Sequence, residues 1–139
     1  MKKTTILFSL IILILSTACK SDKKSEPIFD TTWELEYLFG PTDDIDKLFN
    51  DKNPQITFNK KTMKVEGNSG CNGYSAKFTL EGSRISFGEP GPTTMMYCGE
   101  GENFFLGILK RINKYKIDDK GKLNLLVGDI PFLRFKKID

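Results

Sequence analysis

The sequence predicts a β-rich α+β fold, in which an antiparallel rolled sheet or partly open barrel of about eight strands surrounds one main helix. Two observations lead to this prediction. From residue 28 onward, most of the chain alternates apolar and polar residues in short runs that are separated by turn residues. Residues 102–112 instead repeat apolar side chains at the i, i+3, i+4 and i+7 spacing of an amphipathic helix.

The alternating runs define the predicted strands, and their sequential hairpins predict antiparallel pairing. The runs are residues 32–39, 55–59, 62–67, 74–81, 84–87, 114–118, 122–127 and 130–136. In the first run, Trp33, Leu35, Tyr37 and Phe39 are expected on one face of the strand. A short helix or helical turn is expected within residues 42–50, after a run of aspartates.

The N-terminus has the three-part layout of a bacterial secretory signal. Lys2 and Lys3 precede an apolar run over residues 6–15, and small residues at 16–18 lead to Cys19. The apolar run has roughly half of the ~20 residues that a spanning helix needs. A small residue before a cysteine at this place resembles the lipobox of bacterial lipoproteins, although Ser16 stands where the usual box has leucine. An ordinary signal peptide that leaves Cys19 free is the alternative.

These features divide the chain into three parts. Residues 1–18 are predicted to be a lipoprotein signal peptide, and residues 19–28 a lipidated Cys19 with a flexible tether. Residues 29–139 then form one folded domain, which a palmitate-type anchor would attach to a membrane. The expected location is the cell envelope, with the outer membrane favoured over the inner one, and a monomer is favoured.

Charge and composition exclude several classes of function. The whole chain has a net charge of +3, and removal of Lys2 and Lys3 leaves 21 − 2 = 19 basic against 18 acidic residues. Such a balance predicts no nucleic-acid partner. The chain has no histidine, which excludes Ser-His-Asp and Cys-His catalysis and imidazole metal ligation.

The three cysteines predict a covalent link between two segments of the domain. If Cys19 carries the lipid, Cys71 and Cys98 remain as a pair in an oxidising compartment, which predicts a disulfide. The alternative is a redox-active or metal-binding pair, although the spacing is far from Cys-x-x-Cys. An acidic cluster at Asp43, Asp44 and Asp46 lacks the spacing of an EF-hand. No metal or other cofactor is expected.

Several landmarks in order resemble the META domain, also called the HslJ-like family. They are Trp33-Glu34-Leu35, Val65-x-Gly67-x-x-Gly70-Cys71-Asn72-x-Tyr74, Thr94-x-Met96-x-Cys98 and the acidic helix start at Glu102. The resemblance covers residues 29–137. It implies a small envelope protein, often a lipoprotein, in a family linked to heat stress, antibiotic tolerance or motility and without a general catalytic activity.

Polar residues around the two cysteines are a candidate surface for a ligand or protein partner. They are Asn68, Ser69, Asn72, Tyr74, Thr94 and Tyr97. The alternative, which the residue types favour, is that the Asn and Ser side chains cap backbone groups in tight turns. An aromatic stripe could likewise line a lipid cavity or form ordinary core. It comprises Trp33, Tyr37, Phe39, Tyr74 and Phe78.

The sequence therefore predicts a non-enzymatic envelope lipoprotein with a binding role or a stress-related role in envelope integrity. Its partners would be the membrane, through the lipid anchor, and another envelope protein. The alternative function is a carrier of a small apolar ligand or lipid within a barrel-like cavity.

Overall fold

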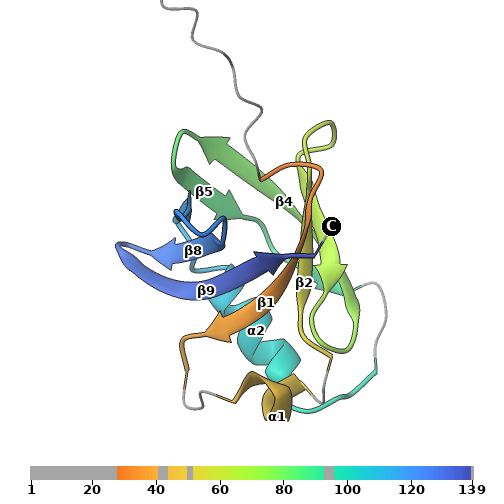
Figure 1. The fold of residues 1–139 in the computed structure, drawn as a ribbon. Coiled ribbons are helices and arrows are strands. Elements are labelled where there is room, and N and C mark those ends of the chain that lie inside the picture. The colour runs from red at the N-terminus through yellow and green to blue at the C-terminus, as the bar shows by residue number, and fades with distance from the viewer. Residues whose placement is uncertain (1–27, 41–43, 50–51, 93–95, 139) are drawn as a thin grey trace, which may run out of the picture.

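The computed structural model describes residues 28–40, 44–49, 52–92 and 96–138. They form one antiparallel sheet of nine strands with two helices (Figure 1). The strands are β1 Thr32–Leu38, β2 Gln55–Asn59, β3 Lys64–Asn68, β4 Gly73–Glu81, β5 Arg84–Phe87, β6 Gly91–Pro92, β7 Lys114–Ile117, β8 Leu123–Val127 and β9 Ile130–Lys137. The helices are α1 Ile45–Phe49 and α2 Gly101–Leu109.

The sheet closes on itself, so the predicted rolled sheet or partly open barrel is a closed barrel. The strand order is β3-β2-β1-β9-β8-β7-β5-β4, and a further β3–β4 pairing joins the two ends. Only the two-residue β6 lies outside this ring, where it pairs with the first half of β4. Closure removes the exposed sheet edges that would otherwise pair with other chains. The predicted strands do not include β6.

Strand β1 corrects the prediction that Trp33, Leu35, Tyr37 and Phe39 share one face. The register between β1 and β9 shifts between Leu35 and Tyr37, as in a β-bulge. An extra residue reverses the alternation that follows it. Trp33 and Leu35 are therefore buried, but so is Leu38, whereas Phe39 is 48% exposed. The Tyr37 ring lies under the guanidinium of Arg134 at 5.4 Å, and the Phe39 and Phe132 rings lie 4.7 Å apart.

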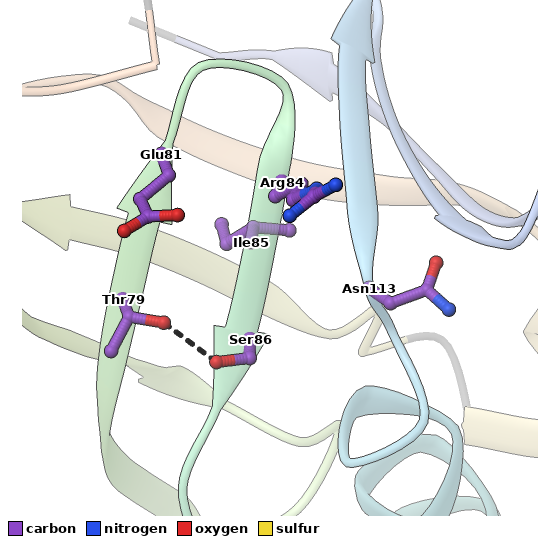
Figure 2. Close-up of a pocket in the computed structure, with 6 residues that line it drawn as sticks. All are labelled: Thr79, Glu81, Arg84, Ile85, Ser86 and Asn113. Atoms are coloured by element: carbon purple, nitrogen blue, oxygen red, sulfur yellow. Dashed lines mark hydrogen bonds between the residues drawn. The ribbon is translucent and has the colours of Figure 1, made fainter.

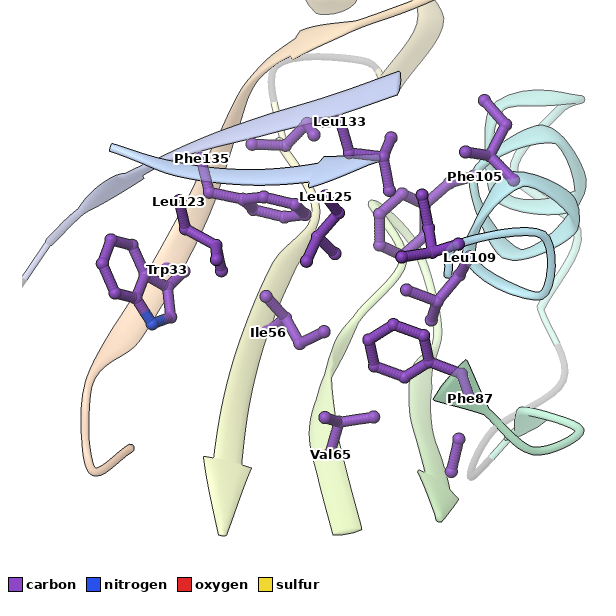
Figure 3. Close-up of a cluster of buried hydrophobic side chains, with 14 of the residues drawn as sticks. Trp33, Ile56, Val65, Phe87, Phe105, Leu109, Leu123, Leu125, Leu133 and Phe135 are labelled. Atoms are coloured by element: carbon purple, nitrogen blue, oxygen red, sulfur yellow. The ribbon is translucent and has the colours of Figure 1, made fainter. Parts of the chain in front are cut away.

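The barrel interior is filled by apolar side chains from its strands and from α2 (Figure 3). Phe105 and Leu109 of α2 point into this core and are fully buried. The Phe105 ring meets Tyr74 at 5.8 Å and Phe135 at 6.5 Å, both edge to face. Such aromatic pairs stabilise a core beyond the area they bury. The main helix predicted at residues 102–112 thus corresponds to α2, which begins at Gly101 and ends at Leu109.

Two sets of connecting segments lie at opposite ends of the barrel. The turn between β2 and β3 lies at the upper end in Figure 1, where the described part of the chain also begins. Helix α1, within the predicted residues 42–50, lies at the lower end with the turn between β3 and β4. Among the described residues, no helix is long and apolar enough to span a membrane. The predicted signal segment and Cys19 lie outside the described residues.

Candidate functional site

Cys71 and Cys98 form a disulfide, as the sequence predicted. Cys71 lies in the turn between β3 and β4, and Cys98 lies three residues before α2, so their Cα atoms are 5.9 Å apart across 27 positions of sequence. The bond fastens the segment before the helix to the barrel wall. This covalent link defines the candidate site, which we call the disulfide loop: residues 96–100.

Asn72 fixes the disulfide loop a second time, through its side chain. The Met96 N–H donates to Asn72 Oδ1 at 2.9 Å, and Asn72 Nδ2 donates back to the Met96 carbonyl at 2.7 Å. The Asn72 side-chain amide therefore exchanges two hydrogen bonds with the Met96 backbone, as paired residues of neighbouring strands do. Asn72 is buried, and a buried amide is costly unless it is bonded in this way. The backbone of Met96 is therefore held against the barrel.

Glu102 joins the same network from the first turn of α2. Its Oε2 accepts from Asn72 Nδ2 at 2.7 Å, and its Oε1 lies against the Ser69 hydroxyl. The Ser69 hydroxyl also reaches the Asn72 carbonyl at 2.8 Å, although its single hydrogen can serve one acceptor at a time. A carboxylate near a helix N-terminus is also favoured by the helix dipole. Ser69 and Asn72 were among the predicted surface residues, whereas no sequence pattern predicted Glu102 as their partner.

Asn68 and Gly70 shape the turn itself. Asn68 Oδ1 accepts from the Gly70 N–H at 3.0 Å, and its amide donates to Gln55 Oε1 at 3.3 Å. Gly70 has a φ of +93°, and a Cβ there would lie 2.4 Å from the Phe49 ring. Only glycine combines this backbone angle with such a close approach. Asn68, Ser69 and Asn72 thus cap and join backbone groups, as the alternative interpretation of the sequence expected.

Tyr74 belongs to the core and not to a binding rim. Its side chain is buried, and its hydroxyl donates to the Gln55 carbonyl at 3.2 Å. Burial raises the pKa of this phenol far above its ordinary value. Tyr74 is therefore neutral and structural, and it neither contacts solvent nor supplies a proton.

Tyr97 and Met96 are the exposed part of the site. Tyr97 is 82% exposed and Met96 is 65% exposed. The Tyr97 hydroxyl makes one long hydrogen bond to Glu100 Oε1, at 3.4 Å. Of the five predicted surface residues that the structure describes, only Tyr97 is largely open to solvent; the sixth, Thr94, lies outside the described residues. Met96 was not among those six, because a methionine in a polar loop gives no signal of exposure.

A shallow groove of about 400 Å³ lies on the outer face of the β4–β5 hairpin (Figure 2). Its lining comprises Thr79, Glu81, Arg84, Ile85, Ser86 and Asn113. The Thr79 and Ser86 hydroxyls are hydrogen-bonded to each other at 2.7 Å. Small-molecule sites are usually concave and mostly apolar. This groove is open to solvent rather than enclosed, and no sequence pattern predicted a site among its residues.

Asp44 and Asp46, the described members of the acidic cluster, lie at the start of α1. Among the described residues, no group of three or more Cys, Asp or Glu side chains converges. Asp44 instead pairs with Lys47 at 2.8 Å, and its carboxylate accepts the Lys47 N–H at the start of α1. The Lys47 side chain lowers the pKa of Asp44. Asp43 lies outside the described residues.

Comparison with known proteins identifies the family. The family model of the META domain matches residues 26–138. An NMR structure of a protein from Burkholderia xenovorans is similar with a TM-score of 0.59 and 22% identity, over 80% of this chain and 83% of that chain. At this identity the likeness shows the fold. A comparison with curated proteins finds no significant match. The chain belongs to the META domain family.

Proposed function

We propose that this protein is a non-enzymatic, lipid-anchored protein of the cell envelope that binds another envelope protein through Met96 and Tyr97. One observation carries the binding role: these two apolar side chains are 65% and 82% exposed on a backbone that is fixed by a disulfide and by Asn72. Exposure of large side chains is ordinary for isolated residues. An adjacent pair on such a restrained loop is not.

The restraint of the loop favours binding. Association costs free energy for every loop that must be ordered, so a loop already fixed in place binds more tightly than a mobile one. Tyrosine and methionine are also enriched at protein interfaces, and tyrosine is enriched among the residues that contribute most to affinity. The Met96–Tyr97 pair therefore has the composition and the rigidity of a small interface centre.

The envelope location rests on the N-terminal sequence and on the cysteines. The positive, apolar and small-residue segments before Cys19 support export and acylation. The Cys71–Cys98 disulfide supports an oxidising compartment. The absence of histidine in the sequence supports a role without acid–base or nucleophilic catalysis. A role in envelope integrity under stress is the physiological setting that we propose for the partner.

The test compares two double variants in affinity capture from detergent-solubilised membranes of the native host. Met96→Ser with Tyr97→Ser should lower capture of the partner by at least about tenfold, because two anchors are lost. Ile130→Ser with Ile138→Ser is the matched control, since these residues are also large, apolar and exposed. A partner that the control variant retains and the loop variant loses supports the binding role. Equal capture by all three proteins contradicts it.

A separate measurement tests the anchor. Mass spectrometry of the N-terminal peptide from membrane fractions should find Cys19 at the first position with acyl chains attached. An unmodified Cys19 in a soluble fraction would contradict the lipid anchor and leave the binding role to its own test.

The carrier function has less support than the binding role. A carrier needs an interior cavity that encloses most of its ligand. Among the described residues, the barrel interior is occupied by packed side chains such as Phe58, Phe105 and Phe135, each fully buried (Figure 3). The apolar stripe expected to line a cavity is also split, since Phe39 faces solvent.

A further inference from the structure

The turn between β2 and β3 gathers positive charge at one end of the barrel. Lys60 and Lys61 lie in the turn, Lys64 begins β3, and Lys77 of β4 is directly opposite Lys64 in the sheet register. We call these four residues the lysine end. Like charges directly opposite each other on neighbouring strands destabilise a sheet. The Lys64–Lys77 pair therefore has a cost in the isolated domain that the fold itself does not explain.

Within the described residues, no acidic side chain forms an ion pair with these four lysines. Ion pairs there join other lysines to acids, for example Lys122 to Glu36 at 2.7 Å and Lys136 to Glu34 at 3.0 Å. None of the five ion pairs in the described part of the chain includes a lysine-end residue. The exposed Glu66 is two positions from Lys64, but it forms no ion pair with any of the four. The lysine end is thus open to an external anion.

The lysine end also carries an exposed apolar side chain. Met63 is 37% exposed at the last position of the turn, next to β3, and has a φ of +51°, which is unusual for a residue other than glycine. Its carbonyl accepts the Phe78 N–H at 3.0 Å, so its backbone is fixed to β4. Basic residues around an exposed apolar side chain are typical of surfaces that lie in a lipid headgroup region.

The chain enters the barrel at this same end. Ile28 is buried, Phe29 forms a bridge with Phe58 next to the turn, and Lys60 Nζ lies 5.2 Å from the centre of the Phe29 ring. Cys19 is only 28 − 19 = 9 positions earlier. A chain of that length reaches at most about 30 Å. An anchor at Cys19 would therefore keep the lysine end, rather than the disulfide loop, near the membrane (Figure 1).

We infer that the lysine end is a docking surface for the anionic phospholipid headgroups of the membrane that carries the anchor. The inference rests on the proposed function, because the anchor is what brings this end to a lipid surface. Its consequence is orientation: the lysine end faces the membrane, and the Met96–Tyr97 pair at the opposite end faces a partner. Each lysine near such a surface contributes about 1 kcal/mol of attraction, and the attraction decays over ~8 Å at physiological ionic strength.

The test measures vesicle binding of the mature chain, residues 19–139, with Cys19→Ser, so that neither the signal segment nor an acyl chain contributes. The readout is the ratio of partitioning onto vesicles of phosphatidylglycerol and phosphatidylcholine to partitioning onto phosphatidylcholine alone, at low salt. Lys61→Gln, Lys64→Gln and Lys77→Gln together should lower this ratio by on the order of a hundredfold, about fivefold for each lysine. Lys60 is kept because it packs on Phe29.

The matched control removes the same charge elsewhere. Lys52→Gln, Lys116→Gln and Lys120→Gln change three exposed lysines and should alter the ratio by no more than about threefold. Equal loss in both triple variants would show a net-charge effect and overturn the inference. A wild-type ratio near one, together with binding to a soluble anionic polymer through the same lysines, would also overturn the inference. Because the protein tested is unacylated, the result is independent of the fate of Cys19.

Discussion

At the scale of single residues, Asp118 shows how one carboxylate fixes a turn. Its Oδ1 accepts the N–H groups of Lys120 and Lys122 at 3.0 and 2.9 Å, and its Oδ2 accepts from Asn124 Nδ2 at 3.0 Å. The Lys122 N–H, followed by the Asn124 amide, holds the pKa of Asp118 below its ordinary value. A lowered folded-state pKa adds stability above the unfolded pKa of about 3.9, and this stability is lost as pH falls through the folded value.

The Asp118→Asn variant should therefore be less stable than wild type at neutral pH, and the difference should shrink as pH falls below about 4. Urea unfolding across this pH range measures the difference. Asp119→Asn, at an exposed neighbouring position, should follow the wild-type pH dependence. A constant difference between Asp118→Asn and wild type at every pH would contradict the assignment.

The residue types in the sequence predicted side-chain hydrogen bonds correctly where both partners are close in sequence. Asn and Ser in the turn before β4 indicated backbone capping, and the structure shows it at Asn68 and Ser69. The contact from Asn72 to Glu102 crosses 30 positions, so no local pattern could reveal it. The Cys71–Cys98 disulfide brings the turn and the segment before α2 together, but it does not specify which side chains then meet.

At the scale of elements, glycines decide which strands and helices can approach. Gly67 of β3 is opposite Ile56 in β2, and a Cβ at Gly67 would lie 1.9 Å from the Gln55 carbonyl oxygen. Backbone cannot move away easily, so Gly67→Ala should destabilise the fold by about 1–3 kcal/mol or more. Gly107 in α2 has no atom within 4 Å of the same position, and Gly107→Ala should stabilise the helix by about 0.5–1 kcal/mol.

Chemical denaturation of the two alanine variants measures these opposite effects. Far-UV circular dichroism provides the check that each variant is folded before unfolding. Similar shifts of both midpoints in one direction would contradict this account of the two glycines.

The strands also show the limit of period-two patterns. Alternation located all eight strands of the barrel, although the first four residues of β8 are all buried. It failed within β1, where the bulge after Leu35 moves Tyr37 and Phe39 outside. A bulge inserts one residue without any residue type that marks it, so the pattern before and after it reads as continuous. Strand β6 was missed because two residues are too few for any period.

At the scale of the whole molecule, the barrel separates a lysine end from the disulfide loop. The sequence predicted the fold class, the disulfide pair and the family resemblance. It did not predict closure, because the β3–β4 pairing needed to complete the ring depends on strand order and shear. The lysine end and the disulfide loop lie at opposite ends because the two turns that flank β3 contain Lys60 and Cys71, respectively. The hydrophobic pattern and the composition of the sequence therefore predict the individual strands and helices, and the strand topology determines their relative positions.

The last prediction concerns the Cys71–Cys98 disulfide, which joins the turn between β3 and β4 to the segment before α2. The loop it closes, across 27 positions, contributes about 3.5 kcal/mol on the chain-entropy model. Cys71→Ser with Cys98→Ser should lower the free energy of unfolding by about that amount. The Asn72 and Glu102 hydrogen bonds do not depend on the cysteines, so much of the loop should keep its place in the folded variant.

Two measurements separate these expectations. Thiol titration of denatured, non-reduced wild-type protein should find neither Cys71 nor Cys98 reactive, and denaturation with and without reductant should give the stability difference. Amide exchange at Met96 should remain slow in the double variant, because its N–H still donates to Asn72. Fast exchange at Met96 in a variant that is otherwise folded would show that the covalent bond alone positions the loop. The Asn72 side chain would then be a consequence of the disulfide and not a second restraint.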